Sequence, residues 1–204
     1  GRKPDEAFIQ ALVDKAKKKK KPFSKEEYIE GFGHYYRLMM TSVGETLGDL
    51  KTYAPNYKGQ GYEIAGFVWF QGFNDKFSDH STSTYQENMA HFIRDVRKDL
   101  KSPKLPFVIG AMGHQGTEQK GTTKILADAQ IATAQMPEFK GNVITVKTAD
   151  FWDYDAGKAF ENKNKDPDTW AKLGSNRAYH YFGSAAFFEK TGTAFAEAVI
   201  ELGK

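Results

Sequence analysis

Ile64-Ala65-Gly66-Phe67-Val68-Trp69-Phe70-Gln71-Gly72-Phe73-Asn74-Asp75 sets the architecture expected of this chain. Its first half, up to Phe70, is a short apolar run rich in aromatic and β-branched residues, which predicts a buried central strand. Its second half changes abruptly to polar residues that can leave a strand end and face a cleft. Because ligands bind at the carboxyl ends of strands in open α/β sheets, we expect a functional site there. The same pattern also fits a buried strand followed by an ordinary Gly-Asn-Asp turn.

Apolar spacing on both sides of this run predicts the remaining elements. Helices are predicted over residues 4–21, 24–31, 34–51, 84–100 and 123–136, and strands over 105–112 and 143–146. A loop is predicted over 76–83, and a long loop with some helix over 151–171. A last helix is expected to carry Phe188, Gly192, Phe195 and Val199 on its inner face. Ser24 with Glu27, and Thr84 with Glu87, read as capping boxes at two helix starts. This alternation predicts an α/β fold built from parallel βαβ units with right-handed crossovers.

Composition predicts a single globular domain over residues 1–204. The 40% hydrophobic content argues against disorder, and a net charge of +3 is too small to dictate a partner. The absence of cysteine excludes disulfides and thiolate chemistry. No apolar run approaches the roughly 18 residues of a membrane span, so we expect no membrane partner. The chain opens at Gly1 without a methionine, and we therefore expect it to be a processed or truncated piece.

A lysine run, Lys17 to Lys21, marks residues 1–33 as a lysine-rich helical segment. Clustered cations can displace counterions from phosphates, which makes a basic nucleic-acid-binding module one hypothesis for this chain. However, no aromatic or arginine is interleaved to read a base, and one block of lysines is usually a solvated helix end. We therefore expect no nucleic-acid partner.

Two sequence blocks carry a resemblance to a known family. Trp69-Phe70-Gln71-Gly72-Phe73-Asn74-Asp75 resembles the W-Y-Q-G-E-x-N/D block of the sialate O-acetylesterase branch of the SGNH (GDSL-type) hydrolases. Ser175-Asn176-Arg177-Ala178-Tyr179-His180-Tyr181-Phe182-Gly183-Ser184 resembles the terminal histidine block of the same branch. The similarity runs from about Tyr35 to the C-terminus, and the lysine-rich front has no clear match.

The resemblance implies a fold and a reaction. The fold would be a three-layer α/β/α sandwich with a parallel sheet of flavodoxin-like order, here lacking its first strands. In such enzymes a serine attacks an acetyl ester on a sugar, a histidine moves the proton, and backbone and side-chain donors hold the oxyanion. The implied partner is an acetylated carbohydrate, no cofactor is expected, and the compartment would be periplasmic or extracellular.

Individual residues take family positions in this alignment. His180 sits at the position of the general base, and Asp75 aligns with the family's Asn/Asp. Asn74 beside it is chemically the better oxyanion donor, because a carboxylate would repel developing negative charge. Gln71 and Gly72 are expected to shape the substrate pocket. We expect His114, in a loop at the exit of the second strand, to face the same cleft.

Three departures from the family pattern matter. Phe73 replaces the usual glutamate, and Arg177 stands three residues before the histidine, where the acid often lies. An arginine cannot orient an imidazole, so Asp153 after the third strand is our candidate for the acid. The nucleophile is the third departure. No serine follows a strand in a Gly-x-Ser setting; the chain has Ser24, Ser42, Ser78, Ser81, Ser83, Ser102, Ser175 and Ser184.

Two interpretations follow from the missing nucleophile. In the first, the chain is the C-terminal portion of a carbohydrate O-acetylesterase, and a companion N-terminal segment supplies the serine. In the second, it is a catalytically inactive carbohydrate-binding or structural module derived from that fold. No His-x-x-x-His pair, cysteine pair or carboxylate cluster indicates a metal site.

Overall fold

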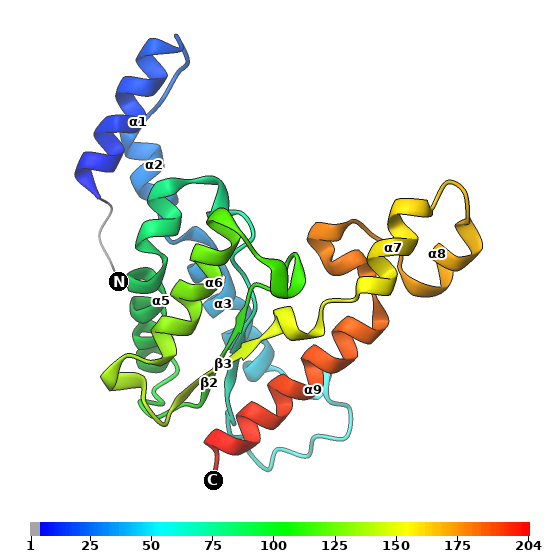
Figure 1. Ribbon diagram of the computed structural model, residues 1–204. Helices are drawn as coiled ribbons and strands as arrows, with labels where there is room; N and C mark the ends of the chain where they lie inside the picture. Colours follow the sequence, from blue (N-terminus) through cyan, green and yellow to red (C-terminus); the bar gives the residue numbers. More distant parts are fainter. Residues whose placement is uncertain (1–4) are drawn as a thin grey trace. The chain divides into compact units, whose positions relative to one another are not determined.

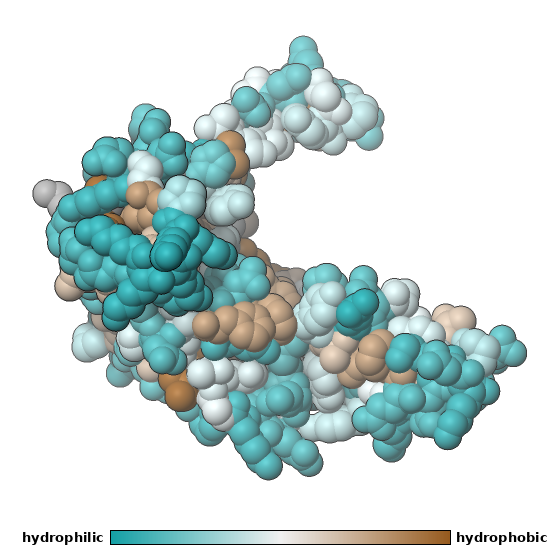
Figure 2. Space-filling view, turned by 90° about the horizontal axis from the view of Figure 1, so that it is seen from above, coloured by the Kyte–Doolittle hydropathy of each residue, from teal (hydrophilic) through white to brown (hydrophobic). Residues whose placement is uncertain are grey.

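The computed structural model describes residues 5–204, and the chain divides into two compact units, residues 1–63 and residues 64–204. The sequence predicted one domain over residues 1–204. Pro4, expected in the first helical turn, lies outside the described residues. In the part of the chain that is described, no helix is both long and apolar enough to cross a bilayer. The face shown in Figure 2 is mostly hydrophilic, with scattered hydrophobic areas.

The first unit is helical. Its helices are α1 (Glu6–Lys18), α2 (Lys25–Gly31), α3 (His34–Gly48) and α4 (Leu50–Tyr53). Ser24 caps α2 as predicted, because its hydroxyl accepts a hydrogen bond of 3.1 Å from the Glu27 amide. The predicted continuous helix over 34–51 is wrong: Asp49, with φ −130°, separates α3 from α4. The lysines of residues 17–21 are all exposed, as expected of a solvated helix end.

The second unit is an α/β fold with a small parallel sheet (Figure 1). The strands are β1 (Phe67–Trp69), β2 (Phe107–Ala111) and β3 (Val143–Lys147), and the helices are α5 (Asp79–Asp99), α6 (Gly121–Ala134), α7 (Tyr154–Asn162), α8 (Pro167–Leu173) and α9 (Ala185–Leu202). The order is β1-β2-β3, with Phe67 paired to Phe107 and Phe107 to Val143. The predicted parallel βαβ units are therefore confirmed.

The place of β1 in the sheet differs from the prediction. We expected a buried central strand up to Phe70, but β2 is the central strand of the described sheet and β1 is a three-residue edge strand. Val68 in its middle is 41% exposed. An apolar run indicates that a strand packs against other elements, but it contains no information about how many neighbouring strands it has. All five residues of β2 are buried.

Two helix predictions are corrected by local contacts. Helix α5 begins at Asp79, within the predicted loop over 76–83, because Ser78 caps it by accepting a hydrogen bond of 3.2 Å from the Ser81 amide. Thr84, expected as the cap, lies inside the helix and donates its hydroxyl to the His80 carbonyl at 2.7 Å. The segment 151–171, predicted as a long loop with some helix, contains α7 and the start of α8.

The inner face of α9 is rotated from the prediction in its first half. Phe187 is fully buried whereas Phe188 is 47% exposed, and a methyl group at Gly192 would meet no atom within 4 Å. Phe195 faces the sheet as expected: its ring lies 2.7 Å from where a Cβ of Gly110 would be. Since each helical residue turns by about 100°, one residue of error changes which side chain is buried.

The sheet of the second unit is covered on both sides (Figure 1). Phe107 of β2 packs against Phe92 of α5 with ring centroids 6.0 Å apart, and α6 contacts β2 and β3 on the same side. Gly110 faces the opposite side, where α9 approaches its backbone. This alternation buries β2 on both faces and leaves the carboxyl ends of the strands to the loops.

Candidate functional site

Gln130 of α6 joins the exits of β1 and β2. This side chain has no solvent exposure. Its Nε2 donates to the main-chain carbonyl of Gln71 at 2.8 Å, and its Oε1 accepts from the Met112 amide at 2.7 Å. The Tyr85 hydroxyl also donates to the Gln71 carbonyl, at 3.0 Å, and accepts from Gln130 Nε2. Burial strongly raises the pKa of Tyr85, so its phenol stays a neutral donor.

The loop after β1 is shaped by Gly72. Its φ is 146°, and an added Cβ would lie 3.2 Å from both Gln130 Nε2 and a methyl carbon of Leu126. The loop then turns back, since the Asp75 amide donates to the Gly72 carbonyl at 3.0 Å. Gln71 Nε2 donates to Asp75 Oδ2 at 2.9 Å, so the two side chains hold each other. Glycine is therefore the residue that this close approach and backbone angle require.

The histidine block adopts an unusual backbone. Tyr181 and Phe182 have φ angles of 51° and 61°, in the left-handed region that aromatic residues rarely occupy. The Phe182 carbonyl accepts from the amides of Ser175 and Asn176 at 2.8 and 2.9 Å, which closes the loop on itself. Such backbone costs about 1–3 kcal/mol per residue and persists only where the surroundings enforce it.

Tyr181 links this block to the exit of β2. Its hydroxyl accepts from the Gly113 amide at 3.2 Å, and its ring stacks on Phe187 at 4.0 Å between centroids. Burial raises the pKa of Tyr181 to about 12, so the phenol is neutral at physiological pH. The contacts of this side chain therefore anchor the histidine block over the strand ends.

A cavity of about 190 Å³ opens where these segments meet. It is lined by Phe70, Gln71, Gly72, Phe73, Asn74, Met112, His114, Tyr179 and Tyr181. The walls thus come from the exits of β1 and β2 and from the histidine block, three segments that are far apart in the sequence. Apolar and aromatic walls with a few polar groups are typical of small-molecule sites.

His114 is the buried imidazole of this cavity, with 5% exposure. Its ring lies between Phe73 and Tyr181, at 4.8 and 4.4 Å between centroids. Nε2 is 2.8 Å from the Tyr179 carbonyl, and since a carbonyl only accepts, Nε2 carries the proton. Burial lowers the pKa of His114 to about 4, although the bond to Tyr179 opposes the shift. The ring is therefore neutral at pH 7, with its Nδ1 lone pair left as an acceptor.

The predicted catalytic residues lie at different distances from this cavity. Asn74 lines it, is exposed, and makes no side-chain hydrogen bond within residues 5–204. His180 is exposed and is not itself a lining residue, but its two neighbours Tyr179 and Tyr181 are. The His180 Nδ1 is 3.1 Å from Asn176 Oδ1. The structure thus brings Asn74, Gln71, Gly72 and His114 together, with Asp75 held by Gln71 and His180 one residue outside.

Asp153 makes no hydrogen bond or ion pair with His180. It caps α7, where its Oδ1 accepts from the Ala156 amide at 2.8 Å, and its Oδ2 accepts from the Ser184 hydroxyl. Ser184 in turn caps α9 by accepting from the Phe187 amide at 3.2 Å. None of the serines among residues 5–204 lines the cavity. The same residues contain no group of three His, Asp or Glu side chains that could hold a metal ion.

Sequence reasoning missed Gln130 and Tyr181. A glutamine at an inward position of an otherwise apolar helix was the available signal for Gln130, since a buried amide needs partners. Tyr181 is adjacent to the histidine that drew attention to the block. Its role depends on the left-handed backbone of Tyr181 and Phe182, and their residue types do not predict this conformation.

Comparison with known proteins gives two matches. A family model described as "Carbohydrate esterase, sialic acid-specific acetylesterase" (SASA) matches residues 13–160. A protein of Arabidopsis thaliana named as a probable carbohydrate esterase is 36% identical over 56 residues, which is 28% of this chain. The match spans 22% of that relative, about a fifth of its length. No solved structure gives a significant match.

Proposed function

The chain belongs to the carbohydrate esterase family of sialic acid-specific acetylesterases, and from this premise we propose that it forms the histidine-bearing portion of an enzyme that hydrolyses acetyl esters on carbohydrates. One observation supports this most: the cavity at the strand exits, which Asn74 lines and beside which His180 stands. The loops from β1, β2 and the histidine block supply it with polar groups within aromatic walls.

The proposed chemistry assigns a role to each group. His180 takes the proton of a serine as it attacks the acetyl carbonyl, and returns it to the leaving sugar hydroxyl. The Asn74 carboxamide, which has no other bond among the described residues, donates to the oxyanion that develops. Water then hydrolyses the acetyl-enzyme. We propose that the serine comes from a segment outside this chain, and that β1 pairs with a strand of that segment within a three-layer sandwich.

Asp153 was our candidate for the acid that orients His180, and its two oxygens accept hydrogen bonds from Ala156 and Ser184. We therefore assign the orienting role to a different residue. In this proposal the Asn176 carboxamide, 3.1 Å from His180 Nδ1, orients the imidazole. An amide oxygen can accept a hydrogen bond from Nδ1–H and so fix the tautomer in which Nε2 is the base. It supplies no charge to stabilise the imidazolium.

The alternative is a carbohydrate-binding module without esterase activity. Two observations favour it: no serine of residues 5–204 lines the cavity, and no carboxylate in that range makes a hydrogen bond or ion pair with His180. In this version Asn74, His114 and the aromatic walls bind a sugar, and His180 has no chemical role.

The deciding experiment measures hydrolysis of 4-nitrophenyl acetate by the full-length protein. We expect His180→Ala to lower kcat by at least 100-fold. His91→Ala, a half-exposed histidine of α5 that does not line the cavity, serves as the matched control and should stay within twofold. Labelling with a serine-directed phosphonate should give one adduct per molecule. Unchanged activity in His180→Ala, or no adduct, would favour the binding module.

A further inference from the structure

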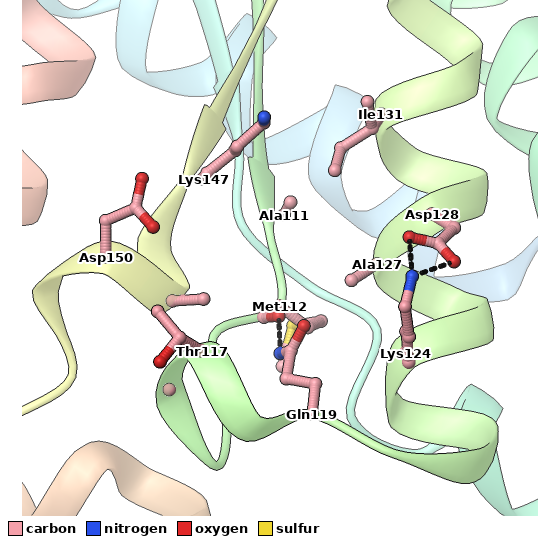
Figure 3. A pocket seen from close by; sticks show the side chains of 12 residues that line it. Ala111, Met112, Thr117, Gln119, Lys124, Ala127, Asp128, Ile131, Lys147 and Asp150 are labelled. Atoms are coloured by element: carbon pink, nitrogen blue, oxygen red, sulfur yellow. Dashed lines mark hydrogen bonds and ion pairs between the residues drawn. The ribbon is translucent and has the colours of Figure 1, made fainter.

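A second cavity, of about 240 Å³, lies at the carboxyl ends of β2 and β3 (Figure 3). One wall is α6, with Lys124 and Asp128, and the opposite wall is the end of β3 and the turn after it, with Lys147 and Asp150. The loop of residues 116–119 closes it from below in this view. Neither the family match nor the proposed catalytic residues assign a role to this cavity.

The floor of this cavity is apolar and its rim is charged. Ala111, Met112 and Ala127 are buried beneath it. On the α6 wall, Lys124 Nζ pairs with both oxygens of Asp128, at 2.8 and 2.6 Å. On the opposite wall, Lys147 and Asp150 are exposed and make no side-chain hydrogen bond or ion pair within residues 5–204. The cavity thus offers a free donor and a free acceptor above an apolar floor.

The loop that closes the cavity is held in one shape. Gln119 Nε2 donates to the carbonyls of Met112 and His114, the second at 3.0 Å. The Thr117 amide donates to the Tyr154 hydroxyl at 3.2 Å. A Cβ on Gly116 would lie 2.4 Å from that same hydroxyl, so the backbone is packed directly against it. The wall is therefore formed before any ligand arrives, which limits the ordering cost of binding.

The two cavities are neighbours along the rim of the sheet. Met112 lines both of them. Gln119, in the wall of the second cavity, bonds the carbonyl of His114, whose ring lines the first. The two cavities therefore adjoin at Met112 and the loop that follows it.

We propose that the second cavity binds the neighbouring sugar unit of an acetylated oligosaccharide or polysaccharide. This inference rests on the proposed function, and it makes the substrate a glycan chain and not a free monosaccharide. A pyranose ring presents an apolar C–H face, which fits the floor of Ala111 and Met112. Its hydroxyls donate and accept at once, which fits Lys147 and Asp150 on the rim. A solvated charged groove with no ligand is the competing interpretation.

The test is binding of named glycans to the 204-residue chain, followed by ¹H–¹⁵N NMR. The probes are xylotetraose, cellotetraose and tetra-N-acetylchitotetraose, each compared with its own monosaccharide. We expect at least one tetrasaccharide to bind at least tenfold tighter than its monosaccharide and to shift the amides of Thr117, Lys147 and Asp150. The double variant Lys147→Ala, Asp150→Ala should lose that gain. The matched control is Asp155→Ala, Lys158→Ala, an exposed pair on α7.

The proposal is overturned if no tetrasaccharide shifts these amides, or if the Lys147 and Asp150 variant binds the tetrasaccharide as well as the wild type does. The binding result is independent of catalysis. If the glycan binds at Lys147 while His180→Ala leaves ester hydrolysis unchanged, the subsite stands and the esterase assignment fails. If His180→Ala abolishes hydrolysis but no glycan reaches Lys147, the esterase stands without this subsite.

Discussion

The side-chain amide of Gln130 donates a hydrogen bond of 2.8 Å to the main-chain carbonyl of Gln71, across 59 residues of sequence. The same side chain accepts from the amide of Met112, so one buried glutamine sets the separation of the two loops that form the cavity. The site is thus organised by a residue that does not line it.

Replacing Gln130 with leucine should destabilise the second unit by about 2–4 kcal/mol, because the Met112 amide would be buried without a partner. The free energy of unfolding from urea titration measures this. Gln135→Leu, at the exposed C-cap position just after the same helix, should change it by less than about 0.5 kcal/mol. Equal effects of the two substitutions would mean that the Gln130 hydrogen bonds do not stabilise the fold.

The stability of the protein should decrease as the pH is lowered, because His114 is buried in its neutral form. The unfolded imidazole has a pKa of about 6.5 and the folded one about 4, so between these values only the unfolded state binds a proton. Stability is then full above about pH 6.5 and falls as the pH drops towards 4, by up to about 3 kcal/mol. Urea unfolding at pH 4.5 and 7 should show a smaller difference in His114→Gln than in the wild type.

The control for this pH effect is His34→Gln, because His34 is exposed and should leave the pH dependence unchanged. A ¹⁵N spectrum of the wild type at pH 7 should also show the Nε2–H tautomer of His114. A tautomer with the proton on Nδ1 would contradict the hydrogen bond to the Tyr179 carbonyl.

Two glycines should respond to alanine in opposite directions. A Cβ at Gly113 would lie 2.5 Å from Thr148 Oγ1 and 2.6 Å from the Ala149 amide nitrogen, so Gly113→Ala should cost about 1–3 kcal/mol. Gly192, inside α9, has open space around it, and Gly192→Ala should stabilise by about 0.5–1 kcal/mol. Thermal unfolding of both variants tests the pair, and a stabilised Gly113→Ala would refute the packing at the strand exit.

Two arginines of α5 should contribute unequally to stability, because one is buried and the other is exposed. Arg97 is 8% exposed and its guanidinium donates to the carbonyls of Leu105 and Asn142, just before β2 and β3. Arg97→Met should cost about 2–4 kcal/mol, because these carbonyls lose charged partners. Arg94 makes an exposed pair with Glu138, and Arg94→Met should cost less than about 1 kcal/mol. Chemical denaturation measures the free energy of unfolding of both variants. A larger loss for Arg94→Met than for Arg97→Met would contradict the prediction.

The sequence was sufficient for the order of the strands, for most of the helices and for much of the cavity. Alternating apolar runs predicted the parallel βαβ units, and a polar strand exit at Gln71 to Asn74 predicted which loop lines the cavity. Both depend on short stretches of chain, where spacing determines which side chains share a face. The SASA match confirms the family resemblance and contains the first of the two stretches on which it rested. The match begins at residue 13, within the lysine-rich segment expected to have no match, and ends at residue 160, before the histidine block.

What the sequence did not predict depends on contacts between distant residues. The edge position of β1 depends on which strands pair with it. The role of Gln130 depends on the Gln71 carbonyl, which lies within hydrogen-bond distance of its side chain. Ser78 and Thr84 are both suitable N-cap residues for α5, and the helix begins after Ser78. Spacing within one helix cannot rank such alternatives.

The hydrogen bond from Gly113 to Tyr181 joins residues that are 68 positions apart. A contact of such long sequence separation closes only after most of the unit has collapsed, since the loop entropy must be offset first. The cavity therefore cannot be completed before the chain has been made as far as Tyr181. On the ribosome, it cannot exist until the segment around Phe187 has emerged, and any ligand that it binds will report on completed folding.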